Sequence, residues 1–204
     1  MANRRIPRHV GFIPDGNRRW AAERGMAKQE GYRHGIEPGL RLHDECRRLG
    51  VEEISIYCFT KDNVKRPAVQ TEAFKQASID FASAVADRGA AVLVVGDDTS
   101  TQFPAELAPF RERQGDGMKV NLLMNYGWDW DLAGLKTGEL RSQPVSRMDL
   151  IVRWGGGRRL SGFLPVQSVY ADIYVCDALW PDYAPEHFED ALAWFRQQDQ
   201  TLGG

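Results

Sequence analysis

Short apolar runs alternate with amphipathic stretches along the chain, and this alternation limits the possible fold more than any other feature. Residues 90–95 (AAVLVV) are a continuous apolar run and residues 9–13 (HVGFI) and 120–124 (VNLLM) are mainly apolar, which is typical of strands buried on both faces. Residues 71–88 place apolar side chains at helical spacing and end at Gly89. Strands that alternate with helices predict an α/β fold, with a mostly parallel sheet covered by helices on both faces.

The same patterns predict the remaining elements. We expect strands at residues 54–59, 149–152 and 172–176, and helices at residues 18–25, 35–49 and 185–198. The chain has 204 residues and shows no repeat, low-complexity tract or linker. A single domain spanning residues 1–204 is therefore expected.

Composition excludes several classes of protein. The chain has 26 Lys+Arg and 28 Asp+Glu, a net charge of −2, which argues against a dedicated nucleic-acid binder. Three scattered cysteines form no disulfide framework and have no zinc-site spacing with the histidines, so we expect a reducing, cytoplasmic location. No apolar run reaches about 18 residues, so no transmembrane segment is expected. The basic start lacks the apolar segment of a signal peptide.

The first third of the chain is basic, although the protein as a whole is slightly acidic. Residues 1–66 contain 14 Lys+Arg against 9 Asp+Glu, whereas residues 67–204 contain 12 against 19. This asymmetry indicates a local anion site, but a solvated helix face would give the same count. Because ligands of parallel sheets bind beyond the carboxyl ends of strands, the positions of the arginines distinguish the two interpretations.

The loop after the first expected strand combines a carboxylate with cations. Residues 14–20 (PDGNRRW) place Asp15 just before Arg18 and Arg19, at the start of a helix whose free N–H groups favour an anion. A carboxylate among phosphate-binding groups needs a bridging cation, and Mg²⁺ is the usual one. A simple capped turn, with Asp15 or Asn17 as the N-cap, would use the same residues.

Two further strand ends carry basic loops. Residues 60–67 (TKDNVKRP) follow the second long strand, and residues 153–162 (RWGGGRRLSG) follow the strand at 149–152. The glycine-rich loop offers flexible backbone and arginine donors that suit a phosphate group, although a tight turn with exposed arginines would look alike. Neither a Walker motif nor GxGxxG is present. Together the three loops indicate two diphosphate-bearing ligands side by side with one Mg²⁺.

Some residues that resemble other sites are better explained structurally. The pair Asp97 and Asp98 does not form a DDxxD metal motif. Asp129 and Asp131 are expected to be acids in the first turn of a helix. Cys58 lies in a predicted strand and is expected to be a core residue rather than a nucleophile.

These motifs resemble those of the cis-type prenyltransferases, the undecaprenyl diphosphate synthase family. The similarity begins with HVGFIPDGNRRWAAERG, continues through IYCFTKDNVKRP, NLLMNYG and RWGGGRRLSGFLPVQSVYADIY, and ends near ALWPDY. It covers essentially the whole chain in the same order. The resemblance implies a homodimer with a six-stranded, mostly parallel sheet and an apolar tunnel. It also implies an enzyme that ionises an allylic diphosphate and couples the cation to a second isoprenyl diphosphate.

The resemblance implies roles for individual residues. The catalytic residues would be Asp15, Asn17, Thr60 and Asn63. The residues that bind substrate diphosphates would be Gly16, Arg18, Arg19, Lys28, Arg66, Arg153, Arg159 and Ser161. The Mg²⁺ ligands would be Asp15 and Asp172, the latter in place of a family Glu.

Several positions depart from the family pattern. Gly157 replaces a Glu, Val64 a Trp, Tyr32 a His, Lys28 an Arg and Arg18 a Gly. The tail at residues 201–204 lacks an Arg, and the chain is shorter than typical elongating enzymes near residues 133–147. These departures resemble the subset that makes irregular, lavandulyl-type products, in which two short allylic units join head to middle.

We therefore expect a Mg²⁺-dependent enzyme that couples dimethylallyl or geranyl diphosphate into a short, branched prenyl diphosphate. The first alternative is a short-chain Z-prenyl diphosphate synthase that elongates with isopentenyl diphosphate. The second is a non-catalytic partner subunit, against which the intact Asp15, Asn17 and Arg19 set argues. A phosphohydrolase with Asp15 as nucleophile would need a second acid where Asn17 stands.

Overall fold

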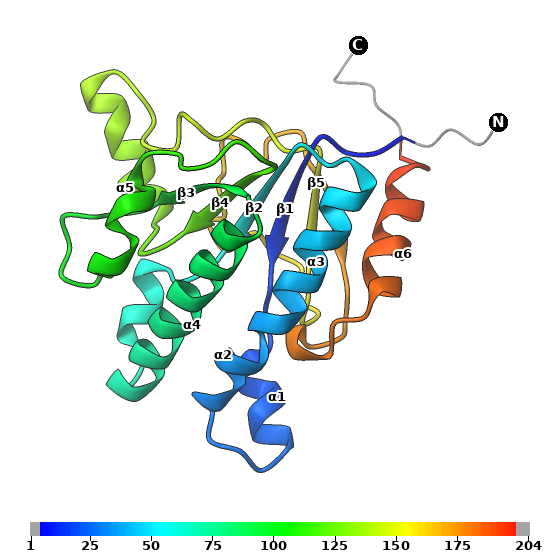
Figure 1. The fold of residues 1–204 in the computed structure, drawn as a ribbon, viewed down its shortest axis with the longest axis horizontal. Coiled ribbons are helices and arrows are strands. Elements are labelled where there is room, and N and C mark those ends of the chain that lie inside the picture. The colour runs from blue at the N-terminus through cyan, green and yellow to red at the C-terminus, as the bar shows by residue number, and fades with distance from the viewer. Residues whose placement is uncertain (1–4, 199–204) are drawn as a thin grey trace.

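Six parallel strands form the central sheet of the computed structural model, which describes residues 5–198 (Figure 1). The strands are β1 (His9–Ile13), β2 (Glu53–Tyr57), β3 (Ala91–Val95), β4 (Lys119–Leu123), β5 (Leu150–Arg153) and β6 (Asp172–Val175). Their order is β3-β4-β2-β1-β5-β6, and every pairing is parallel. The predicted parallel α/β sheet is confirmed, and all six strands within residues 5–198 run parallel.

Strand order determines where a ligand can bind. β1 pairs with β2 on one side and with β5 on the other. After β1 the chain builds β2, β3 and β4 on one side, and it then crosses to build β5 and β6 on the other. Between β1 and β5 the connections diverge, which opens a crevice at the carboxyl ends of the strands.

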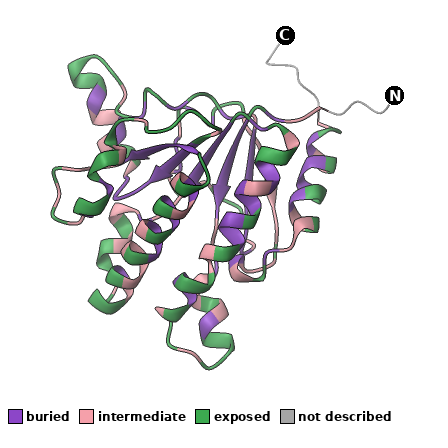
Figure 2. Cartoon of the chain, in the orientation of Figure 1, coloured by how far each residue is buried: buried purple, intermediate pink, exposed green. Residues whose placement is uncertain are grey.

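The long helices pack on one face of the sheet (Figure 1). They are α3 (Ile36–Leu49), α4 (Ala68–Asp87) and α6 (Pro185–Phe195). Alternate strand residues such as Phe12 and Ile54 meet apolar residues of these helices in one buried cluster. The sheet is buried along most of its length, whereas the outer sides of the helices are exposed (Figure 2). The short helices α1 (Asn17–Glu23) and α2 (Glu30–His34) follow the carboxyl end of β1.

The other face of the sheet has a thinner cover. Short helix α5 (Trp128–Ala133), a 3₁₀ helix at Gly134–Thr137 and the loop segments around residues 145–148 and 160–171 lie there. The β5–β6 connection contains a glycine run and Pro165, which disfavour a long helix. The expected helices on both faces are thus present, but the long ones all lie on one side.

Boundaries differ in detail from those expected. Helix α4 begins at Ala68 directly after Pro67, three residues earlier than predicted, because proline readily precedes or opens a helix. Helix α2 was not predicted, since it has only five residues. Further 3₁₀ helices lie at Lys61–Lys65, Ala105–Arg111 and Trp180–Asp182. Among the described helices, none is both long and apolar enough to cross a membrane. The predicted change in the tail at residues 201–204 lies outside the described residues.

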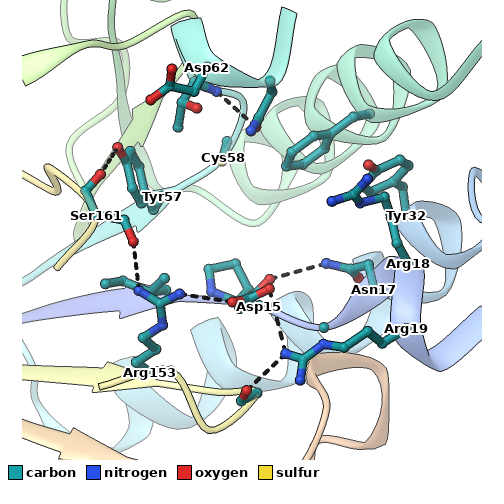
Figure 3. A pocket seen from close by; sticks show the side chains of 18 of the residues that line it. Asp15, Asn17, Arg18, Arg19, Tyr32, Tyr57, Cys58, Asp62, Arg153 and Ser161 are labelled. Atoms are coloured by element: carbon teal, nitrogen blue, oxygen red, sulfur yellow. Dashed lines mark hydrogen bonds and ion pairs between the residues drawn. The ribbon is translucent and has the colours of Figure 1, made fainter. Parts of the chain in front are cut away.

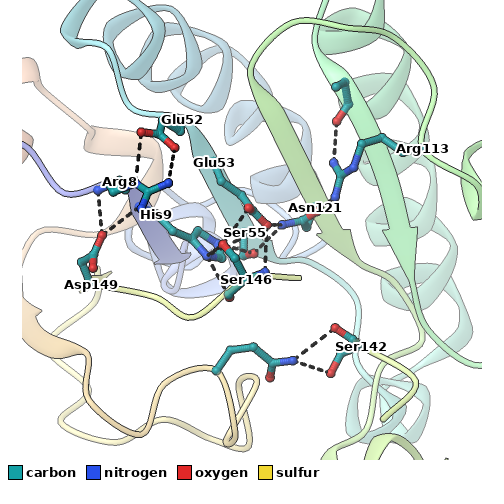
Figure 4. Close-up of polar contacts among 12 residues, drawn as sticks. Arg8, His9, Glu52, Glu53, Ser55, Arg113, Asn121, Ser142, Ser146 and Asp149 are labelled. Atoms are coloured by element: carbon teal, nitrogen blue, oxygen red, sulfur yellow. Dashed lines mark hydrogen bonds and ion pairs between the residues drawn. The ribbon is translucent and has the colours of Figure 1, made fainter. Parts of the chain in front are cut away.

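A buried polar network joins the strands at the opposite end of the sheet from the crevice (Figure 4). His9 Nε2 lies 2.8 Å from Ser55 Oγ, and Asn121 donates to Glu53 at 2.7 Å and to Ser55 at 3.0 Å. Ser146 Oγ donates to Glu53 at 2.7 Å. Ser55 is 0% exposed and His9 2% exposed, so no substrate can reach them without local opening. The network satisfies buried polar groups of β1, β2 and β4.

Candidate active site

A cavity of about 880 Å³ lies at the carboxyl ends of β1, β2 and β5 (Figure 3). It is lined by every residue predicted from the three basic loops and by Lys28. These residues are Asp15, Gly16, Asn17, Arg18, Arg19, Lys28, Thr60, Asn63, Arg66, Arg153, Arg159 and Ser161. The structure therefore brings together three loops that are far apart in the sequence.

Asp15 lies where the loops after β1 and β5 meet. Its Oδ2 accepts a 2.8 Å hydrogen bond from Arg153, and its Oδ1 lies 3.8 Å from Arg19. Its backbone carbonyl accepts from Trp180 N at 3.0 Å, which anchors the loop. Gly16 has φ +114°, a conformation that glycine adopts readily, so the chain can turn sharply between Asp15 and α1. The carboxylate is 40% exposed and faces the cavity.

The glycine-rich loop lies against the first helix. Arg19 donates to the carbonyl of Gly155 at 2.8 Å. A Cβ at Gly155 would collide with the Arg19 guanidinium, and φ there is +79°. Only glycine fits this position well, because both the backbone conformation and the close approach exclude a side chain.

Arg153 is the most constrained cation of the site. Its side chain is 5% exposed, and it donates to Asp15, to Ser161 Oγ at 3.0 Å and to the carbonyl of Arg159. Its Nε is buried without a hydrogen-bond partner. A buried donor without a partner costs free energy, so an acceptor supplied by a ligand would stabilise this arrangement.

Ser161, in the loop after β5, is held in place by a tyrosine at the end of β2. Tyr57, the last residue of β2, donates from its hydroxyl to the Ser161 carbonyl at 2.8 Å. Ser161 has φ +54°, which is uncommon for a residue other than glycine. The hydrogen bond stabilises this backbone conformation, in which Ser161 Oγ meets Arg153.

The loop after β2 is the third loop that lines the cavity. Thr60 N donates to Asn63 Oδ1 at 3.1 Å, which organises the turn before α4. Arg66 donates to the Tyr32 hydroxyl at 2.9 Å. Burial lowers the pKa of the Arg66 guanidinium, and the nearby Arg18 lowers it further. A cation that burial disfavours is stabilised when an anion binds beside it.

Asn17 opens helix α1 and points into the site. Its Nδ2 donates to the Pro14 carbonyl at 3.1 Å, while its Oδ1 is buried without a partner. Helix α2 packs closely on this point, since a Cβ at Gly31 would collide with the Asn17 carbonyl. The unpartnered oxygen lies beside Gly35, where an added Cβ would be 2.5 Å from it, so it is buried between α1 and the turn that joins α2 to α3.

Cations greatly outnumber carboxylates in the cavity lining. The cations are Arg18, Arg19, Lys28, Arg66, Arg153 and Arg159, and the carboxylates are Asp15 and Asp62. Asp62 is already paired with Lys65 at 2.6 Å. A concentration of positive charge in a concave site attracts and stabilises polyvalent anions.

The donor set fits a metal ion only when an anionic ligand shares it. No group of three or more His, Cys, Asp or Glu in residues 5–198 could hold a metal. Asp15 offers one carboxylate, and Mg²⁺ is commonly held by one or two carboxylates together with phosphate oxygens. Asp15 therefore suits a Mg²⁺ ion that arrives with a diphosphate.

Asp172 does not lie in this cavity. It begins β6 and pairs with Leu150, whereas Arg153, at the site, pairs with Val175. The two pairs are three residue steps apart along the strands, a distance of about 10 Å at about 3.3 Å per residue. Within one chain Asp172 thus lies at the far end of the strand from Asp15, because the parallel register of β5 and β6 places it there. Its role as a metal ligand stays a prediction.

Some lining residues were not predicted as part of the site. Tyr57, Asp62 and Phe74 line the cavity. Tyr57 could have been found, since it ends a strand whose carboxyl end meets the ligand. Phe74 belongs to the apolar face of α4, so nothing in the sequence distinguishes it from a core residue of that helix. Cys58 also lines the cavity, but burial raises the pKa of its thiol to about 12, so it stays protonated at neutral pH.

The other acids are engaged as the sequence indicated. Asp97 accepts from Lys61 at 2.9 Å. Asp129 and Asp131 lie in the first turn of α5. Asp131 is also buried, where it accepts a 2.7 Å hydrogen bond from the Tyr126 hydroxyl. These acids stabilise local structure and do not form a second metal pair.

Comparison with known proteins gives consistent results. A family model described as "Putative undecaprenyl diphosphate synthase" matches residues 13–203. An isoprenyl transferase of Leptospira interrogans is 30% identical, and the alignment covers 98% of this chain and 95% of that protein. A ditrans,polycis-undecaprenyl-diphosphate synthase of Yersinia pseudotuberculosis, specific for (2E,6E)-farnesyl diphosphate, is 29% identical over 98% of this chain and 91% of its own length.

A solved structure shares the fold. It is the lavandulyl diphosphate synthase of Lavandula x intermedia, in complex with dimethylallyl diphosphate, with a TM-score of 0.81. The two chains are 23% identical, and the match covers 97% of this chain and 98% of the other. The alignment with the Leptospira interrogans protein spans 230 positions, so that protein carries residues that this 204-residue chain lacks.

Proposed function

This chain is a prenyltransferase of the undecaprenyl diphosphate synthase family, and from that premise we propose that it couples two short isoprenyl diphosphates into a branched, lavandulyl-type diphosphate. The observation that carries the proposal is the cation-rich cavity, in which the carboxylate of Asp15 lies between two groups of arginines. Arg18, Arg19 and Arg66 belong to one side and Arg153 and Arg159 to the other. Two diphosphates bound to these two groups would both lie next to Asp15.

We infer that the side formed by the first two loops holds the allylic donor. When the allylic C–O bond breaks, its electron pair leaves with the diphosphate, and negative charge develops on that group. Arg19 and Arg66 are fixed in place before the reaction, by Gly155 and Tyr32 respectively, and fixed cations stabilise developing charge without reorganisation. Asn17 also lines the cavity, and its buried Oδ1 lies beside Gly35, so the amide would have to rotate to bring this oxygen toward the allylic cation.

The side formed by the loop after β5 would hold the second substrate. Arg153 and Ser161 are joined by a 3.0 Å hydrogen bond, and Arg159 also lines the cavity. They would bind the second diphosphate and orient its double bond toward the cation. A carbon–carbon bond then forms, and a proton leaves the resulting cation to restore a double bond. The departed diphosphate is a base close to that proton.

Mg²⁺ fits this scheme as a cofactor. Asp15 would hold it together with diphosphate oxygens, and the ion would supply charge neutralisation for the departing group. Arg153 occupies Asp15 Oδ2, and Asp15 is 40% exposed, so the carboxylate has room to exchange this partner for a metal.

Irregular coupling, rather than elongation with isopentenyl diphosphate, is favoured by one residue on each side. At position 157 the family carboxylate is absent, and Gly157 lies directly beneath the Arg153 guanidinium. Val64 replaces an aromatic residue in the turn after β2. The solved structure that shares this fold is named a lavandulyl diphosphate synthase.

A homodimer is part of the proposal. Four apolar residues are well exposed on the thinly covered face and at the adjoining sheet edge: Val166, Val169, Tyr170 and Ile173. Exposed apolar patches mark interaction surfaces. Asp172 is next to Ile173 in this exposed segment. In a dimer formed through the segment, Asp172 would approach the cavity of the second copy. A cytoplasmic location agrees with the free cysteines Cys46, Cys58 and Cys176.

Product analysis tests the proposal. The protein would be supplied with Mg²⁺ and with dimethylallyl or geranyl diphosphate, with and without isopentenyl diphosphate, and the dephosphorylated alcohols would be identified. We expect a branched product without isopentenyl diphosphate. A linear Z-product that strictly requires isopentenyl diphosphate would overturn irregular coupling in favour of short-chain elongation. No product under either condition would indicate a partner subunit.

A further inference from the structure

A second, smaller cavity lies directly behind the cation-rich one, between β1, β2 and helices α2, α3 and α4. Its volume is about 60 Å³, and its lining is mainly apolar. The two cavities share five lining residues: Pro14, Asn17, Tyr32, Cys58 and Phe74. These residues form the wall between the diphosphate site and the apolar interior, so a hydrocarbon chain that enters the interior must pass them.

Two aromatic rings make up most of this wall. Tyr32 of α2 stacks on Phe74 of α4, with ring centroids 4.4 Å apart and an interplanar angle of 4°. The Tyr32 hydroxyl accepts the 2.9 Å hydrogen bond from Arg66. Arg66 lies just before α4 and Phe74 lies within it, so this segment holds both the hydroxyl and the ring of Tyr32. Tyr32 is 4% exposed and has little freedom to move.

The space behind the wall is too small for a prenyl unit. An engineered protein cavity of about 150 Å³ binds benzene, which has six carbons. A cavity of about 60 Å³ does not accommodate a five-carbon unit unless a wall moves. The far side is also closed, because Phe81 lies so near α3 that a Cβ at Gly39 would be 2.7 Å from its ring.

We propose that Tyr32, held by Phe74 and Arg66, is a gate that limits the donor hydrocarbon to one five-carbon unit. This inference rests on the proposed function and adds to it the size of the donor. Dimethylallyl diphosphate leaves its whole hydrocarbon in the large cavity. The second unit of geranyl diphosphate has to enter the space that Tyr32 closes. Removal of the ring opens space of the same order as the about 150 Å³ that binds benzene, enough for one further unit.

The test is the ratio of kcat/KM for geranyl diphosphate to that for dimethylallyl diphosphate. Tyr32→Ala should raise this ratio by about ten-fold or more, because the second unit gains a buried apolar site. Tyr32→Phe keeps the ring and should change the ratio by less than about two-fold. Both substrates carry the same diphosphate, so any weakening of diphosphate binding through the lost contact with Arg66 affects both and does not change the ratio. Tyr174→Ala, the same change in a tyrosine that packs on Trp194 outside both cavities, is the matched control.

Phe74→Leu opens the same wall from α4 and should shift the ratio in the same direction. If Tyr32→Ala fails to fold, this variant carries the test. Binding of dimethylallyl and geranyl S-thiolodiphosphates, measured by calorimetry, gives a readout without turnover. An unchanged ratio in folded Tyr32→Ala or Phe74→Leu, by kinetics or by calorimetry, would overturn the gate. Failure of the proposed function would appear differently. The unaltered protein would then turn over neither donor, whereas the variants would still shift the binding ratio measured by calorimetry.

Discussion

Substitution of Gly157 by alanine should disable the second diphosphate site through Arg153. A Cβ at Gly157 would lie 2.7 Å from Arg153 Nε and 2.8 Å from its Nη2, closer than unbonded atoms approach. Gly157 is not among the residues with positive φ, so alanine suits its backbone. The guanidinium is the part that has to move, and it then loses its contacts with Asp15 and Ser161.

The expected loss follows from those contacts. A hydrogen bond to a charged group contributes about 1.5–3 kcal/mol, which corresponds to about 10- to 150-fold in kcat/KM when the transition state loses it. Gly157→Ala should therefore lower kcat/KM for the second substrate by about this factor. The fold should be retained, since the added methyl group displaces the end of a flexible side chain and no backbone.

Steady-state kinetics with a double-mutant cycle is the appropriate assay. Arg153→Gln removes the guanidinium, so adding Gly157→Ala to it should cost less than about two-fold further. Arg158→Ala is the control within the same loop, because Arg158 is exposed and is not among the residues that line the cavity. The reasoning is refuted if Gly157→Ala alone is nearly silent, or if its cost is undiminished in the Arg153→Gln background.

Three further predictions concern other parts of the molecule. Asp15→Ala should reduce turnover by about 100-fold or more, whereas the variant should still unfold cooperatively in urea. Kinetics and urea denaturation measure the two effects, and retained turnover would refute the assigned role. Tyr57→Phe removes the hydrogen bond that holds Ser161. KM for the second substrate should therefore rise by about 2- to 12-fold, with kcat little changed. An unchanged KM would show that Ser161 does not need this hydrogen bond. Burial lowers the pKa values of His9 and His43 in the fold. The unfolded chain then binds more protons below about pH 6.5, so the free energy of unfolding should fall on acidification by up to about 1.4 kcal/mol per pH unit for each histidine. Urea denaturation between about pH 7.5 and 5.5 measures this, and His9→Gln should reduce the slope; a flat profile would contradict it.

Much of the fold could be predicted because burial in a parallel sheet leaves a local signal. The runs at residues 9–13, 90–95 and 120–124 are mainly apolar on both faces, and each became a strand within about one residue of its expected bounds. Helix α2 could not be predicted in this way. Its five residues are too few to show helical periodicity, and it is stabilised by packing on α1 and α4.

The candidate site could be predicted in outline from strand ends. Asp15 and Arg66 follow β1 and β2, and Arg153 ends β5; parallel strands bring their carboxyl ends to one edge. Asp172 shows the limit of reasoning by motif. Its distance from Asp15 depends on the register of β6 against β5, which no local pattern in the sequence reveals.

The sequence by itself determined the alternation of strands and helices, the charge of the loops and the family, because each depends on residues that are neighbours along the chain. Only the tertiary structure decided which groups meet. The pair formed by Asp15 and Arg153 and the stack of Tyr32 on Phe74 join residues distant in sequence, and strand order and helix packing bring them together. The physical reason is that secondary structure follows local periodicity, whereas the shape of a cavity depends on long-range packing of side chains at close contact.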